Sequence, residues 1–148
     1  MRVLIAGAGE VGFRVARDLV YRGHEVTVVD SNSAAVQRAQ TLDVQVFKGS
    51  AASAKLLFEE ASIEEVDLFI GVTGNDIVNI TGCSIAKKTG CKTIARINNP
   101  ELTEMPEGHE LQQLFGVDAY VSPDELAMHR IWQILSRPAL TRLEHFSV

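Results

Sequence analysis

The sequence predicts an α/β fold in which helices cover both faces of a doubly wound parallel sheet. Short apolar segments alternate with segments of helical periodicity along the 148 residues. A glycine-rich turn joins the first apolar segment to the first helical one, and an acidic residue closes the second apolar segment. Because parallel strands are joined by right-handed crossovers, we expect a Rossmann-like sheet with the order 3-2-1-4-5-6.

The glycine-rich turn follows the apolar segment 3–6 and carries glycines with G-x-G-x-x-G spacing. Gly7 is expected to allow the sharp turn, Gly9 to let a pyrophosphate approach the backbone, and Gly12 to let the helix pack closely on the strand. The helix that follows directs its free N–H groups and positive dipole end at the same place. The turn therefore predicts a phosphate site.

The acidic residue is Asp30, which ends the apolar segment 25–30 and lies 18 residues beyond Gly12. A carboxylate there accepts hydrogen bonds from the ribose hydroxyls of an adenosine. The residues that follow, 31–33, include no Lys or Arg to pair with a 2′-phosphate, which favours NAD(H) or an adenine nucleotide over NADP(H). The alternative is an ordinary strand-end or helix-capping acid.

The remaining elements follow from the same periodicities. The expected strands are residues 2–6, 25–30, 44–47, 67–72, 92–97 and 118–121. The expected helices are residues 10–22, a helix capped by Ser33, 53–61, a helix from Asp76 to about Lys88, and 123–136. Pro100 opens a segment to Gly116 that residues 105–108 should interrupt.

One domain is expected over residues 1–136, with 123–136 as a crossover helix. Residues 137–148 resemble the start of a further element with nothing to pair against, as a truncated chain would show.

In such a sheet, ligands bind at the carboxyl ends of the strands where the strand order reverses, here between the first and fourth strands. Scattered residues that each follow a strand then surround one crevice. The candidate ligand-binding residues are Gly7, Ala8, Gly9, Glu10, Val11, Gly12, Asp30, Ser31, Gly49, Ser50, Thr73, Gly74, Asn75, Asp76 and Arg96.

Several polar residues near this crevice have two interpretations. Arg96 ends an apolar strand, so it needs either a ligand phosphate or an ion pair with Asp76 or Glu10. Asn75 and Asp76 stand at a helix start, where capping explains them and ligand contact stays open. Asn79, one turn later, faces either the crevice or water.

The last helix carries two adjacent apolar rows, one with Ile131 and Ile134, the other with Trp132. This stripe is broader than one sheet face requires, which favours self-association over burial within one chain.

The composition excludes several classes of protein. A net charge of −5 argues against a nucleic-acid surface, no apolar run is long enough to span a bilayer, and Arg2 breaks any secretory signal. Cys83 and Cys91 lack metal-site spacing, which indicates reduced thiols in the cytoplasm and no zinc site. None of the four histidines follows a strand end, so the acid–base group that hydride transfer usually needs is missing.

Together these residues resemble the nucleotide-binding (RCK/KTN, TrkA N-terminal) domain of Trk-type potassium-uptake regulatory subunits and regulators of potassium conductance. The resemblance spans nearly the whole chain and is carried by residues 5–12, 23–30, 72–79, 86–90, 94–100, 116–118 and 121–123. It implies a cytoplasmic, non-enzymatic sensor that binds NAD(H) or ATP/ADP, forms homodimers or higher rings, and lies beneath a membrane potassium transporter or channel. It also implies that Asp30 holds ribose and that the Gly7–Gly12 turn and Arg96 hold phosphate.

The chain departs from the family pattern at two positions. Ser50 follows Gly49 where relatives commonly carry an acid near the adenine, so looser adenine selectivity is expected. Glu10 stands where ATP-responsive relatives often carry Arg, and a carboxylate beside a triphosphate is unfavourable, which favours NAD(H).

Two other functions remain open from the sequence. One is an NAD-dependent oxidoreductase fragment without its substrate domain, and the other is a dimerisation module with a vestigial nucleotide site. The missing acid–base group and the absence of chain for a substrate pocket argue against the enzyme.

Overall fold

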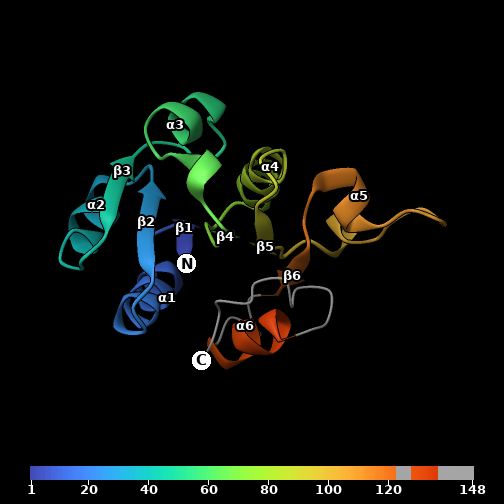
Figure 1. Ribbon diagram of the computed structural model, residues 1–148. Coiled ribbons are helices and arrows are strands. Elements are labelled where there is room, and N and C mark those ends of the chain that lie inside the picture. The colour runs from blue at the N-terminus through green and yellow to red at the C-terminus, as the bar shows by residue number, and fades with distance from the viewer. Residues whose placement is uncertain (123–127, 137–148) are drawn as a thin grey trace.

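The centre of the fold is a six-stranded parallel sheet with the order β3-β2-β1-β4-β5-β6, as the sequence predicts. The computed structural model describes residues 1–122 and 128–136 (Figure 1). The strands are β1 (Arg2–Ala6), β2 (Glu25–Asp30), β3 (Gln45–Lys48), β4 (Leu68–Gly71), β5 (Lys92–Arg96) and β6 (Ala119–Val121). Strand β1 pairs with both β2 and β4, so the strand order reverses there.

Helices cover both faces of this sheet. The α-helices are α1 (Glu10–Tyr21), α2 (Ser33–Ala39), α3 (Ala54–Glu59), α4 (Asp76–Lys87), α5 (Leu111–Phe115) and α6 (Met128–Leu135), and the 3₁₀ helices are η1 (Ile63–Glu65) and η2 (Pro100–Leu102). One apolar core lies between the sheet and α1, α2 and α6, and the other lies between the sheet and α3, α4 and α5 (Figure 1). Strand β4 is buried along its whole length because its residues pack into both apolar cores.

The helix boundaries differ from prediction at two places. Asn32, rather than Ser33, caps α2, because its side chain accepts the Ala35 N–H at 2.9 Å. Helix α3 is shorter than the predicted 53–61, because the chain leaves the helix at Glu60 and Ser62 adopts a left-handed conformation with φ 52°. The predicted interruption at residues 105–108 is confirmed, since η2 and α5 are separate elements.

Helix α6 packs on its own sheet. Ile131 and Ile134 are fully buried in the core beside α1, and Trp132 is half-buried against it. These residues therefore pack within one chain. Their apolar character no longer indicates self-association. Outside the described residues lie the predicted helix start at Pro123, the predicted element at 137–148, and the side chains of Met128 and Leu135. The domain boundary at 136 therefore stays a prediction.

Within the described residues, no helix combines the length and the apolar character needed to cross a bilayer.

Candidate nucleotide site

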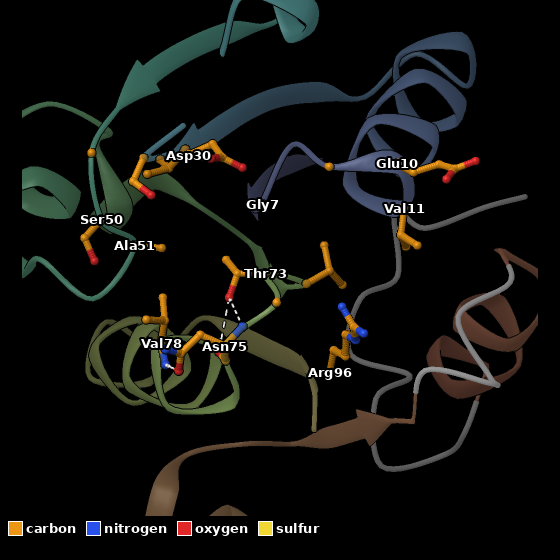
Figure 2. A pocket seen from close by; sticks show the side chains of 16 residues that line it. Gly7, Glu10, Val11, Asp30, Ser50, Ala51, Thr73, Asn75, Val78 and Arg96 are labelled. Carbon is orange, nitrogen blue, oxygen red and sulfur yellow. Dashed lines mark hydrogen bonds between the residues drawn. The ribbon is translucent and has the colours of Figure 1, made fainter. Parts of the chain in front are cut away.

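A cavity of about 560 Å³ lies at the carboxyl ends of β1, β2, β4 and β5 (Figure 2). It occupies the point where the strand order reverses, as expected for a doubly wound sheet. The residues around it are Gly7, Gly9, Glu10, Val11, Val29, Asp30, Ser31, Gly49, Ser50, Ala51, Val72, Thr73, Gly74, Asn75, Val78 and Arg96.

The three glycines of the first turn have different surroundings. Gly7 has φ +109°, and a Cβ there would lie 2.9 Å from the Thr73 nitrogen and the Val72 carbonyl. A Cβ on Gly12 would lie 1.9 Å from the Gly7 carbonyl oxygen, so the protein itself requires glycine at both positions. A Cβ on Gly9 would meet no protein atom within 4 Å. Nothing in the described chain requires glycine at position 9, whereas a phosphate close to the backbone would.

The start of α1 supplies hydrogen-bond donors to this opening. Gly9 is the N-cap residue, and no side chain accepts a hydrogen bond at this helix start. The first-turn amides of a helix have no partner within the helix, and its dipole is positive at this end. The Gly9 opening therefore combines free space with donors suited to a phosphate.

Asp30 connects the end of β2 to the glycine turn. Its Oδ2 accepts the Ala8 N–H and its Oδ1 accepts the Asn32 N–H, both at 2.7 Å. A carboxylate has about four acceptor positions, so two bonds leave capacity for ribose hydroxyls. Asp30 thus shapes the turn in addition to any contact with a ligand.

The segment after β4 forms the opposite wall. Asn75 caps α4 by accepting the N–H groups of Ile77 at 2.9 Å and Val78 at 3.2 Å. Asp76 does not cap the helix. Its carboxylate accepts the Asn98 and Asn99 N–H groups, the latter at 2.8 Å, and it does not line the cavity.

Arg96 projects from the end of β5 toward the cavity (Figure 2). Its Nε donates to Asn98 Oδ1 at 3.2 Å, and no ion pair to it occurs among the described residues. The two predicted ion-pair partners are engaged elsewhere, since Glu10 pairs with Arg14 at 3.1 Å and Asp76 binds backbone amides. The internal ion pair is therefore absent from the described residues, and the guanidinium is the only Lys or Arg side chain among the lining residues.

Twelve of the fifteen predicted residues surround the cavity. Ala8 and Gly12 shape the turn without lining it, and Asp76 supports the loop after β5. The prediction missed Val29, Ala51, Val72 and Val78. Val29 and Val72 stand at the end of β2 and just after β4, so the rule that ligands meet strand ends could have included them.

The lining offers little for catalysis. It includes Glu10 and Asp30 but no His, Cys, Lys or Tyr among the described residues. Both cysteines are buried elsewhere, and burial raises the pKa of the Cys91 thiol to about 12 and that of Cys83 still further. The arrangement is suited to holding phosphate and ribose.

Comparison of the sequence with known proteins finds a domain family and named relatives. The pattern that describes the TrkA-N domain matches residues 3–123. The chain is 35% identical over 155 aligned residues to a Trk system potassium uptake protein TrkA homolog of Methanosarcina mazei, covering 99% of this chain and 34% of that protein. The chain thus spans about a third of the length of that relative.

Solved structures share the fold. The TrkA-N domain of the inner membrane protein ybaL from Escherichia coli has a TM-score of 0.71 at 17% identity, with 91% of this chain and 96% of that chain covered. An AMP-bound Kef C-terminal domain from Shewanella denitrificans has a TM-score of 0.66 at 20% identity, covering 98% and 88%. An NAD-bound enzyme of Bordetella bronchiseptica, WbmG, has a TM-score of 0.55 at 21% identity, covering 70% and 38%. At these identities the likeness concerns the fold, which sensors and enzymes share.

Proposed function

Since the chain belongs to the TrkA-N domain family, we propose that it is the nucleotide-sensing part of a regulatory subunit or domain of a potassium-transport system. In this proposal it binds NAD(H) in the cavity between β1 and β4 and changes the conformation of a membrane partner. The observation that carries the proposal is the opening at Gly9, where a helix start faces a cavity next to Asp30.

The charges around the cavity support a dinucleotide over ATP. The charged lining residues are Glu10, Asp30 and Arg96, so one cation faces two carboxylates. A pyrophosphate diester carries two negative charges and a triphosphate carries more. Repulsion by the two carboxylates, which Arg14 offsets in part by its ion pair with Glu10, therefore disfavours ATP more than a dinucleotide. ADP and ATP remain the alternative ligands.

A regulatory role is supported by the chemistry that the lining lacks. Hydride transfer usually needs a group that moves a proton near the nicotinamide, and the described lining has no His, Lys, Tyr or Cys. The relative that spans three times this length is named as a potassium uptake protein. We propose further that the domain lies in the cytoplasm, at the inner face of the membrane, as a homodimer or larger ring beside a potassium transporter or channel.

Calorimetric titration of NADH, NAD⁺, ADP and ATP into the purified chain tests the ligand. NADH and NAD⁺ should bind more tightly than ATP. Tighter binding of ATP would overturn the NAD(H) assignment, and binding of none of the four would overturn nucleotide sensing.

A further inference from the structure

The support beneath the cavity is built around Asn79, a polar residue of α4 that is completely buried. Its Oδ1 accepts the Thr73 N–H at 2.9 Å and the Thr73 hydroxyl at 2.6 Å. Its Nδ2 donates to the Thr73 carbonyl at 3.1 Å and to the Arg96 carbonyl at 2.9 Å. One side chain outside the cavity lining thus connects the ends of β4 and β5.

Asn79 has little freedom to move. A Cβ on Gly71 would lie 3.1 Å from the Asn79 Cα, so β4 and α4 approach each other closely at this point. A buried amide whose donors and acceptors are all used is costly to displace. The Arg96 carbonyl at the end of β5 is therefore held in a fixed position relative to α4.

A second support holds the side chain of Arg96. Asn98 Oδ1 accepts its Nε–H at 3.2 Å, and Asp76 in the first turn of α4 accepts the Asn98 N–H at 3.0 Å. Helix α4 thus acts on Arg96 twice, through Asn79 on its carbonyl and through Asp76 and Asn98 on its guanidinium.

The two ends of the cavity differ in what they can bind. Figure 2 shows Asp30 and Ser50 on one side, Arg96 and Val11 on the other, and Gly7 and Thr73 between them. A mononucleotide with its ribose at Asp30 would place its phosphate at the glycine turn. The second half of a dinucleotide would extend toward Arg96.

We propose that Asn79 and Asn98 are positioning residues that hold Arg96 for the second half of a bound dinucleotide, and that they thereby set the preference for a dinucleotide over a mononucleotide. This inference rests on the proposed nucleotide-binding function. Neither residue needs to touch the ligand, since both act through Arg96.

The test compares NADH with AMP. Asn98→Ala removes the acceptor for Arg96 Nε from an exposed loop, where the fold should tolerate it. The ratio of NADH affinity to AMP affinity should fall about tenfold while AMP affinity stays constant. The matched control is Asn99→Ala, because the Asn99 side chain lies in the same loop but caps η2 and does not accept the Arg96 Nε–H, which goes to Asn98.

Asn79→Asp removes both donated bonds from a side chain of the same shape. It should lower the same ratio, provided that circular dichroism shows a folded chain. An equal loss for NADH and AMP in both variants would identify the residues as merely structural and overturn the proposal, as would an unchanged ratio in Asn98→Ala.

A measurement without ligand separates this inference from the proposed function. In the free protein, the Arg96 Nε–H resonance should be protected from exchange with solvent and should lose that protection in Asn98→Ala but not in Asn99→Ala. Equal exchange in all three proteins would refute the positioning role. Failure of wild-type protein to bind either NADH or AMP would instead refute the nucleotide site.

Discussion

Gly9 and Gly12 lie three residues apart in one turn, yet only one of them is constrained by the protein. Gly12→Ala places a methyl group against the Gly7 carbonyl oxygen, so it should lower the free energy of unfolding by about 3 kcal/mol or more. Gly9→Ala meets no atom and should cost less than about 1 kcal/mol, the preference for glycine over alanine at an N-cap. It should nevertheless abolish NADH binding, because its methyl group occupies the phosphate position.

Thermal unfolding and calorimetric titration of both variants separate these effects. Normal NADH affinity in folded Gly9→Ala would show that the turn does not hold a phosphate.

Asp30 has a double role in this structure, and its substitution should show both. Asp30→Ala removes the acceptor of the Ala8 and Asn32 N–H groups as well as the proposed ribose contact. We expect NADH binding to weaken by about 1–3 kcal/mol, with a measurable drop in melting temperature. Asp30→Asn keeps one acceptor oxygen. Its NADH affinity and melting temperature should lie between those of the wild-type protein and those of Asp30→Ala. Unchanged affinity in folded Asp30→Ala would remove this residue from the site.

At the scale of elements, the edge of the sheet is held by a buried carboxylate. The Asp118 side chain is 2% exposed and accepts hydrogen bonds from Lys87 Nζ and the Thr93 N–H, each at 2.9 Å. Gln112 of α5 donates to it as well. This carboxylate therefore joins α4, β5 and α5 to the start of β6.

Lys87→Met should lower the free energy of unfolding by about 3–5 kcal/mol, because it leaves that carboxylate buried without its cation. Lys88→Met, at the exposed neighbouring position, should change it by less than about 0.5 kcal/mol. Denaturant unfolding of both variants provides the comparison. Equal stability of the two would mean that the Thr93 and Gln112 donors suffice for Asp118.

For the whole molecule, binding to the folded state alone must raise its stability. At a free NADH concentration of 100 times the Kd, the free energy of unfolding should rise by about 2.7 kcal/mol. Gly9→Ala should show no such increase at the same concentration. A wild-type melting temperature that is insensitive to NADH would contradict binding in the folded state.

Self-association is the second prediction for the whole molecule. The proposed homodimer requires a sedimentation mass above the 16.2 kDa of one chain at micromolar concentration. Ile131 cannot serve as the test position, because its burial in the chain's own core means that a charged substitution would unfold the protein. A mass of one chain at all micromolar concentrations would refute the dimer.

The amino-acid sequence by itself determined the sheet order and most of the cavity. Strand and helix periodicities are local, and the right-handed crossover leaves few ways to assemble them, so the glycine turn, Asp30 and Arg96 could be placed at one edge. The signals that located these residues lie within a few positions of each residue.

The tertiary structure alone decided which polar groups are partners. Asp76 and Asn98 are 22 residues apart and Asn79 and Arg96 are 17 apart, and no periodicity connects them. The inward packing of Ile131 and the difference between Gly9 and Gly12 depend in the same way on atoms from other segments. A residue type states which bonds a side chain can make, whereas the packing of distant segments decides which of them it makes.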